Sequence, residues 1–436
     1  MSIDLTEFVV ETALRLGAEE AECDITNGSN ISLTRREGKV EEAKQATSRG
    51  LSLSVMVEGR YVSCSTSDLR REALEDFIRK AVKAASYLEE DRDRALAPIE
   101  DAETNRAGEF LDTVDPLRAT LHPDARDLYL QELEDLSRSL YQPDVISGSV
   151  FYQDAVQALY RTNSNGISLE EAATWFVAGG ELSLRDGDKM PEGYAHFATT
   201  HMEDLPPTAD IAQAIHDNTR DQVGSKALPS GKYPMLLRRD QAARLLGMLL
   251  GPMSGAALHQ QQSCFSDALG SIIGSRHLTL LSDPTLKRAF GSCIWDNDNR
   301  AAQPRTLVHE GVLREYNIDL YHSRKLGVKP TGGIHNLVVP PGDRTDADIL
   351  LGLPKCIVVT GFLGGNSNPT SGDFSLGIVG TYYENGEKVG AVSEMNVSGN
   401  LTTVFKQLIE VASDPWTYGS TRSPSLLFDD ITFSGK

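Results

Sequence analysis

The sequence predicts an α+β protein in which two small α/β units precede a large β-rich C-terminal domain. Three observations support this fold class. A helix, several strands and a second helix follow one another near the N-terminus, and the same order recurs after residue 125. Short strands dominate beyond a Gly- and Pro-containing segment at 223–234. The length of 436 residues suits two or three domains, which we place at 1–105, 106–225 and 226–436.

The first unit begins with an expected helix at 4–17, where Asp4 and Glu7 form a capping box and Gly17 provides a stop. Apolar and polar residues then alternate in several runs that are typical of strands. These runs are 21–26, 30–38, 50–59 and 60–67, the last two joined by a turn at Glu58-Gly59. A second helix is expected at about 69–87, because its apolar residues fall on one face.

The second unit repeats this order. It comprises a helix at about 126–141, strands near 146–152, 156–163 and 174–185, a segment at 194–205 that is similar to 61–69, and a helix at about 208–223. The repetition predicts two related units in tandem, and ordinary alternation of strands and helices is the alternative explanation. The stretch 88–125 between the units is rich in charge, Pro and Ala, which favours a linker with some surface helix.

The third domain is expected to be built mainly from short strands. They are predicted at 233–237, 291–295, 305–318, 335–341, 355–364, 375–392, 394–400 and 425–435, with helices at 239–250 and 400–412. Asn385-Gly386 is a strong hairpin turn within this region. His309-Glu310-Gly311 also predicts a turn between strands rather than a zinc-binding helix, because no second histidine follows at the required spacing.

Composition excludes several classes of protein. A net charge of −20 argues against a nucleic-acid partner, which requires clustered Lys and Arg. The five cysteines are widely spaced and form no CxxC motif, which indicates a reducing compartment. The N-terminus has no signal-peptide pattern, and no uncharged run is long and apolar enough to span a membrane. We therefore expect a cytoplasmic protein with no membrane partner.

Two polar, Gly-rich segments, KPTGGIHN (329–336) and GFLGGNSNPTSGDFS (361–375), are the candidate ligand-contacting loops. The second lacks the Lys-Ser/Thr pair of a phosphate-binding loop, so a peptide-contacting surface is favoured over a nucleotide site. Ordinary structural turns are the alternative for both segments. No GxSxG, Walker A or GxGxxG motif occurs, and the nine histidines show no helical pairing typical of a metal site.

Four segments together resemble one known family. They are RREGKVEEAKQATSRGLSLSVMVEGRYVSCSTSDL (35–69), LYHSRKLGVKPTGGIHNLVV (320–339), TSGDFSLGIVGTYYENGE (370–387) and VSEMNVSGNLTTVF (392–405). The chain resembles the TldD/PmbA family, once described as modulators of DNA gyrase, over about residues 4–435 and in the same segment order. The resemblance implies one of two branches: TldD-type chains with an HExxxH zinc motif and a C-terminal Cys ligand, or PmbA/TldE-type chains that lack those ligands and pair with a TldD-type subunit.

The HExxxH window of the family, aligned on Ser263-Cys264-Phe265, falls on 247–252 of this chain. Gly247 and Pro252 then stand at the two histidine positions and Met248 at the glutamate position. None of these side chains is a zinc ligand or a general base. The last cysteine is Cys356, so the C-terminal ligand is missing as well. The resemblance therefore implies a PmbA/TldE-type chain without catalytic or metal-binding residues, and zinc in a TldD-like partner.

From this resemblance we expect a subunit of a cytoplasmic zinc metallopeptidase complex that processes unfolded or leader-bearing peptides. An extended peptide would add to a strand edge and be held mainly by main-chain hydrogen bonds. The residues expected to line the peptide channel are Gly332, Gly333, His335, Asn336, Gly372, Asp373 and Phe374, with turn or core roles as the alternative for each. Other open hypotheses are a peptidase acting alone, a homodimeric peptide-binding or scaffold protein, and a gyrase modulator, which the net charge disfavours.

Overall fold

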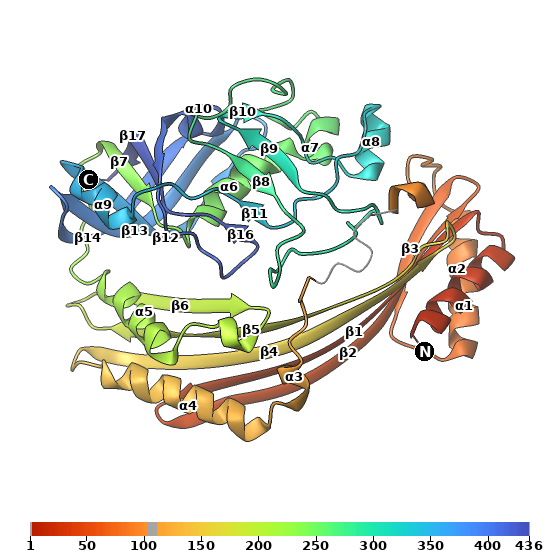
Figure 1. Cartoon of the computed structure of the whole chain (residues 1–436), viewed down its shortest axis with the longest axis horizontal. Helices are drawn as coiled ribbons and strands as arrows, with labels where there is room; N and C mark the ends of the chain where they lie inside the picture. Colours follow the sequence, from red (N-terminus) through yellow and green to blue (C-terminus); the bar gives the residue numbers. More distant parts are fainter. Residues whose placement is uncertain (1, 103–110, 436) are drawn as a thin grey trace.

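A single curved, antiparallel sheet spans the N-terminal half of the chain (Figure 1). The computed structural model describes residues 2–102 and 111–435. The strand order is β3-β2-β1-β4-β5-β6. The strands are β1 (Glu20–Arg36), β2 (Lys39–Val57), β3 (Arg60–Thr66), β4 (Val145–Asn163), β5 (Ser168–Leu184) and β6 (Glu192–Thr199). Two short elements, the 3-10 turn Ile99–Ala102 and helix α3 (Leu117–Thr120), lie between the two groups of strands.

Each half of this sheet has the same order of one helix, three strands and one helix. The first half runs from α1 (Ser2–Arg15) to α2 (Arg71–Ala85), and the second from α4 (Pro123–Ser139) to α5 (Thr208–Arg220). Each half buries its own apolar cluster between its helices and its strands. The predicted order of elements is thus present, but the two units share one sheet through the antiparallel pair β1–β4. A duplication stays a prediction, as does the boundary near 225; the boundary at 105/106 lies outside the described residues.

Several predicted strands were too short. The expected break between 26 and 30 is wrong, because β1 runs through Asn27, Gly28 and Ser29 and pairs there with both β2 and β4. The expected break between 152 and 156 is wrong for the same reason, since β4 is continuous. The predicted start of the next strand at 50 is also wrong, because β2 begins at Lys39. Residues 39–49 are exposed, so they carry no apolar alternation that marks a strand.

Two further sheets form the C-terminal domain, which is β-rich as predicted (Figure 1). One has the order β10-β9-β8-β11-β16 and the other β14-β13-β12-β7-β17-β15. The strands are β7 (Gly231–Leu237), β8 (Leu280–Ser282), β9 (Arg305–His309), β10 (Val312–Leu313), β11 (Leu337–Val338), β12 (Lys355–Ser367), β13 (Asp373–Glu384), β14 (Glu387–Asn400), β15 (Leu408–Val411), β16 (Thr421–Arg422) and β17 (Leu426–Ser434). The helices are α6 (Ala242–Leu250), α7 (Gly255–His259), α8 (Leu320–Leu326), α9 (Asp346–Leu351) and α10 (Leu401–Val404). A large apolar cluster between the two sheets includes residues from α6, β12, β13 and β17.

The hairpin predictions in this domain are confirmed, and two element predictions are wrong. Asn385-Gly386 joins β13 to β14 with positive φ at both residues, and β9 and β10 pair across the turn at Glu310-Gly311. Residues 291–295 form no strand beyond one isolated bridge at Trp295. The helix expected at 400–412 ends at Val404, and a 3-10 turn leads into β15, which pairs with β17.

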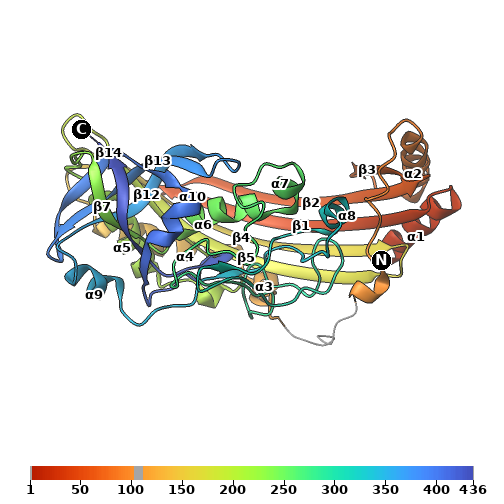
Figure 2. The same ribbon diagram turned by 90° about the horizontal axis from the view of Figure 1, so that it is seen from above.

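The C-terminal domain lies over much of the long sheet, and the end that carries α1 and α2 extends beyond it (Figures 1 and 2). This arrangement places β6 and α5 next to the C-terminal domain. Within residues 2–102 and 111–435, no helix is long and apolar enough to cross a membrane.

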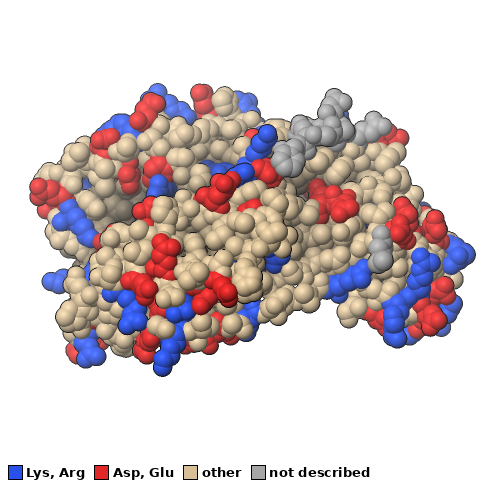
Figure 3. Space-filling model, turned by 60° about the horizontal axis from the view of Figure 1, so that its bottom comes forward, with Lys and Arg blue, Asp and Glu red and all other residues tan. Residues whose placement is uncertain are grey.

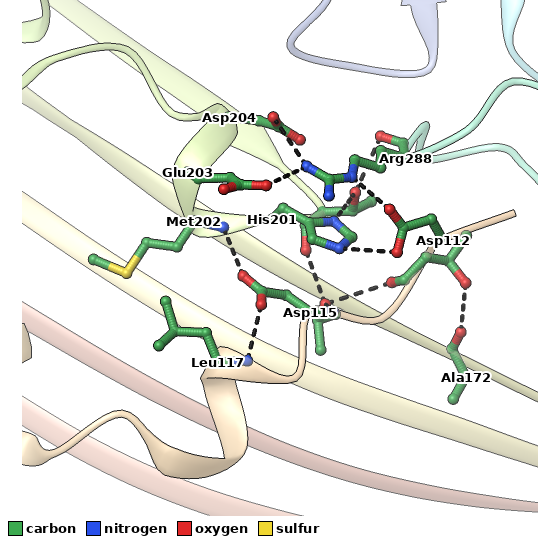
Figure 4. Close-up of polar contacts among 12 residues, drawn as sticks. Asp112, Asp115, Leu117, Ala172, His201, Met202, Glu203, Asp204 and Arg288 are labelled. Carbon is green, nitrogen blue, oxygen red and sulfur yellow. Dashed lines mark hydrogen bonds and ion pairs between the residues drawn. The ribbon is translucent and has the colours of Figure 1, made fainter.

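An ion-pair cluster joins the linker, the long sheet and the C-terminal domain (Figure 4). Arg288 of the C-terminal domain lies 2.6 Å from Asp112 of the linker and 2.5 Å from Glu203, which follows β6. Asp204 lies 3.5 Å from the same guanidinium. Buried His201 lies 3.3 Å from the other oxygen of Asp112. Arg288 of the C-terminal domain contacts three carboxylates, one from the linker and two from the segment after β6. The cluster therefore helps to hold the C-terminal domain against the long sheet.

We expect the substitution Arg288→Met to lower the melting temperature at pH 7 by about 2–4 °C. The hydrogen bond from Arg288 holds the pKa of Asp112 below its usual range. A carboxylate with a depressed pKa stabilises the fold above its unfolded pKa of about 4, and this stabilisation is lost as the pH falls through the folded pKa. The difference between wild type and variant should therefore shrink as the pH is lowered from 5 to 3. Thermal unfolding at each pH measures this difference in melting temperature. Arg79→Met, at an exposed position of α2, is the control. A difference that stays constant to pH 3 contradicts the expectation.

Candidate functional site

The GGIHN segment lies between α8 and β11, and Asn336 anchors it. Asn336 is buried, and its side-chain oxygen accepts a hydrogen bond from the Gly291 N–H at 2.7 Å. Its side-chain nitrogen donates to the Asp283 carbonyl and to the Ser292 hydroxyl, each at 2.9 Å. These three bonds account for most of the hydrogen-bonding capacity of the amide. The side chain therefore holds the loop in place, and a direct contact between Asn336 and a peptide stays a prediction.

The other residues of this segment also make specific contacts. The carbonyls of Gly332 and Gly333 accept hydrogen bonds from Arg305 at 3.2 and 2.6 Å. Gly332 has a φ of +85°, and a Cβ there would lie 2.8 Å from an Asp296 oxygen, so glycine is required. His335 places Nδ1 3.2 Å from the thiol of Cys293. The backbone conformation and the close packing thus explain why glycine occupies position 332. His335 contacts the thiol of Cys293.

The SGDFS segment begins β13 in the other C-terminal sheet. The exposed carboxylate of Asp373 accepts hydrogen bonds from Asn400 and Ser371, both at 2.8 Å. The bond from Asn400 is the larger cause that lowers the pKa of Asp373. Phe374 is buried in the core, and Gly372 has a φ of +81° beside Asn400. The predicted residues therefore lie in segments that lead into two different sheets, and of this second group Asp373 presents a charged side chain to solvent.

Helix α6 carries the positions that align with the zinc motif of the family. Leu245, Leu246 and Leu249 are buried in the core. Gly247 and Gly251 lie on the exposed face, where a Cβ would meet no described atom within 4 Å. The helix ends at Leu250, so Pro252 lies outside it, as expected from its missing N–H. Among the residues that the structure describes, no three His, Cys, Asp or Glu side chains are grouped to hold a metal ion.

A cleft of about 670 Å³ lies between the long sheet and the C-terminal domain. We call it the β6–β12 cleft. Its lining includes Tyr194 and His196 of β6, Arg239 and Arg244 around the start of α6, and 360–364 of β12. The rings of Tyr194 and His196 stack with centroids 5.9 Å apart. Sequence analysis did not identify this cleft, because its walls come from segments that are far apart in the chain.

Strand β12 presents a free edge to this cleft. On its β7 side, the described pairing covers Ile357–Val359, and β7 ends opposite Val359. On the other side β12 continues to pair with β13 as far as Ser367. Guanidinium groups of Arg238 and Arg244 contact the carbonyls of Thr360 and Gly365, at 3.3 and 3.5 Å. The strand predicted at 355–364 is thus confirmed and extends to Ser367, so the first part of the Gly-rich 361–375 segment belongs to β12.

On the facing strand β6, side chains satisfy two carbonyls that lie two residues apart, whereas the two carbonyls of β12 that contact arginines lie five residues apart. The side chain of Asn218 donates to the Tyr194 carbonyl at 2.9 Å, and that of Gln222 donates to the Glu192 carbonyl at 2.7 Å. Both donors belong to α5 or its C-terminal end. Side chains that satisfy edge carbonyls prevent another strand from pairing there. The cleft therefore has one blocked edge, β6, and one edge that is open between two arginines.

A second hollow of about 600 Å³ continues from the cleft. Both are lined by Glu192, Gly193, Tyr194, Gln222, Leu363 and Val379. The lining of the second hollow also includes Glu181, Asp186, Lys189 and Glu394. Leu363 is 62% exposed, an unusual state for a leucine in the interior of a strand. Elsewhere, the face in Figure 3 shows basic and acidic side chains interspersed, without a continuous basic patch.

Comparison with known proteins identifies consistent relatives. Residues 230–435 match the family domain described as the PmbA/TldA metallopeptidase C-terminal domain, and residues 21–85 match PmbA/TldA metallopeptidase domain 1. The chain is 26% identical to the metalloprotease PmbA of Escherichia coli O157:H7 over 440 residues, covering 99% of this chain and 96% of that protein.

Two solved structures have the same fold. One, from Bacteroides thetaiotaomicron, is described as a candidate modulator of DNA gyrase; it is 34% identical with a TM-score of 0.95, covering 99% of this chain and 98% of the other. The other is TldE from Thermococcus kodakarensis, with a TM-score of 0.87 and coverage of 99% and 100%. At 18% identity the second likeness concerns the fold alone.

Proposed function

The chain belongs to the PmbA/TldD metallopeptidase family, and on this basis we propose that it is the peptide-binding subunit of a two-subunit peptidase whose zinc is held by a TldD-like partner. The substrate class is unfolded peptide in extended conformation. The partner supplies the metal and the general base, and this chain supplies part of the channel in which the peptide lies.

The residues at the expected metal positions do not fit a zinc ion. Gly247 and Pro252 have no ligand atoms, and the thioether of Met248 is neither a base nor a usual zinc ligand. The space beside Gly247, where a ligand side chain would project, is open. We therefore derive no hydrolytic step through this chain and assign the hydrolysis to the partner.

The free edge of β12 carries the proposal. An extended peptide placed beside Thr360–Gly364 would exchange main-chain hydrogen bonds with the strand and extend the sheet. Such bonds do not depend on the peptide's side chains, so they select for extension and against folded substrates. The edge lies beside α6, because Arg244 of that helix contacts Gly365. Gly247 on the exposed face of α6 leaves open space beside that helix.

The seven channel residues predicted from sequence become secondary in this proposal. Asp373 is exposed and offers a charge to a ligand, whereas Nδ1 of His335 already contacts the thiol of Cys293. Gly332, Gly333, Asn336, Gly372 and Phe374 support their loops or the core. We propose that the β12 edge, rather than these loops, makes the main contact with the peptide.

Reconstitution of the complex tests the proposal. The purified full chain should hold no stoichiometric zinc and should not hydrolyse an unstructured peptide. Mixed at micromolar concentration with an HExxxH-bearing relative from the same organism, it should co-elute with that relative and raise its kcat/KM. Hydrolysis with stoichiometric zinc by the chain alone would show a peptidase in its own right. Failure of the two chains to associate would refute the heterodimer and leave a homodimeric binding protein.

A pair of matched variants tests the role of the cleft within that complex. Leu363→Asp places a charge on the free edge of β12 and should lower kcat/KM about tenfold, equivalent to 1.4 kcal/mol. Leu128→Asp introduces the same charge on α4, where the leucine is 64% exposed and away from the cleft, and should leave the rate unchanged. Equal rates for the two variants would contradict peptide binding at the β12 edge.

A further inference from the structure

Three arginines, Arg238, Arg239 and Arg244, line the β6–β12 cleft. Arg238 is neutralised by Asp240, with which it makes two bonds at 2.6 and 2.8 Å. Arg239 is only weakly paired, at 4.0 Å from Asp414, and its guanidinium lies 5.9 Å from the ring centroid of Trp416. For Arg244, no carboxylate among the described residues lies within ion-pair distance. Two guanidinium groups are thus available to an anion.

The continuation of the cleft has the opposite charge. Four acidic side chains line it: Glu181, Asp186, Glu192 and Glu394. Lys189, the basic residue of that lining, is already ion-paired with Glu394 at 2.9 Å. Leu363 lines both hollows. The acidic hollow is also lined by Val379 of β13 and Glu394 of β14, so it lies on the side of β12 away from the free edge.

Arg244 occupies the position where a peptide on the β12 edge would end. Its guanidinium contacts the Gly365 carbonyl at 3.5 Å, which is long for a hydrogen bond, so its donors remain largely available. A guanidinium binds a carboxylate through two parallel hydrogen bonds, and such charge-assisted bonds are stronger than neutral ones. A neutral peptide carbonyl at this place would gain much less.

We propose that the cleft binds extended peptides by their free C-terminal carboxylate, with Arg244 as its partner at the Gly365 end of the β12 edge. This inference rests on the proposed function and adds an orientation to it. A zwitterionic peptide placed in the reverse direction would bring its ammonium group to Arg244, which is unfavourable. The chain thus selects both the direction of the substrate and a substrate with a free C-terminal end.

The experiment uses the full chain and one unstructured hexapeptide of Ala, Ser and Leu in three forms: free termini, C-terminal amide and N-terminal acetyl. Calorimetry or fluorescence anisotropy measures the Kd of each. The amide should bind at least tenfold more weakly than the free acid, and the acetyl form should be affected less. Arg244→Gln should remove most of the difference between acid and amide. Arg79→Gln, at an exposed position of α2, is the matched control and should keep the difference between acid and amide.

Each outcome separates this inference from the proposed function. If acid and amide bind wild type equally well, the carboxylate site is refuted and peptide binding stands. If no form binds, both proposals fail. If Arg244→Gln retains the full preference for the acid, the carboxylate is held elsewhere. Circular dichroism and thermal unfolding of each variant establish that a loss of binding is not a loss of fold.

Discussion

Replacement of Asp154 by alanine should lower the free energy of unfolding by about 3–5 kcal/mol. Asp154 lies in the central strand β4 and has no exposed surface. Its carboxylate is 2.5 Å from Arg126 of α4 and 2.9 Å from Arg118 of α3, and it accepts a hydrogen bond from the Tyr152 hydroxyl at 3.1 Å. The side chains of the two arginines are only 5% and 10% exposed. The substitution leaves two buried cations without their counter-ion.

A second variant separates the cost of the unpaired cations from the cost of a lost contact. The triple substitution Asp154→Leu, Arg118→Met and Arg126→Met removes all three charges and keeps a similar volume. It should cost less than the single change, because no buried charge remains uncompensated. Urea unfolding of wild type and of both variants at pH 7 gives the three free energies. Two results would show that the cluster is not desolvated. The single variant would lose less than about 1 kcal/mol of unfolding free energy, or the triple variant would lose more than the single variant.

The substitution Gly179→Val should cost about 3 kcal/mol and also abolish peptide binding. Gly179 lies in β5 opposite His196 of β6. A Cβ at this position would lie 2.2 Å from the Ala195 carbonyl oxygen and 2.8 Å from the Cα of His196. Both obstacles are backbone atoms, which cannot rotate away, so β6 must shift. Overpacking of this kind usually costs about 1–3 kcal/mol, and β6 forms one wall of the cleft.

The matched control is Gly50→Val in β2, where a Cβ would meet no described atom within 4 Å. Valine favours strands, so this variant should be as stable as wild type or slightly more so. Urea unfolding and the hexapeptide binding measurement report on both variants. Equal effects at the two positions would mean that the close contact between β5 and β6 relaxes easily and does not define the cleft.

Features of this chain that depend on neighbouring residues were predicted correctly, whereas features that depend on contacts between distant segments were predicted less well. The turns at Asn385-Gly386 and Glu310-Gly311 were predictable, because positive φ at adjacent residues favours a few residue types. The helix predicted at 400–412 was not correct. Its apolar residues Leu408 and Val411 are buried by pairing with β17, a contact that local periodicity does not contain.

The candidate site shows the same division. Motifs such as GGIHN and SGDFS identified the family, and within them Asn336 and Gly372 adopt the positive φ that Asn and Gly tolerate in turns. A strand at 355–364 was predicted from its own sequence, but its free edge was not, since a strand's sequence does not show which neighbour pairs with it. The edge is free only because β7 ends opposite Val359 and the chain then turns into α6.

Local residue patterns were sufficient for the α+β class, the amphipathic helices and the hairpin turns, because each depends on neighbours within a short stretch of chain. Only the tertiary structure decided three other features. The joining of two units through β1 and β4 and the walls of the β6–β12 cleft bring together segments that are far apart in the sequence. The strand character of the polar half of β2 comes from its pairing with β1 rather than from its own pattern. Hydrogen bonding between strands creates these features, and no periodicity within a single segment records which edge is paired and which stays open.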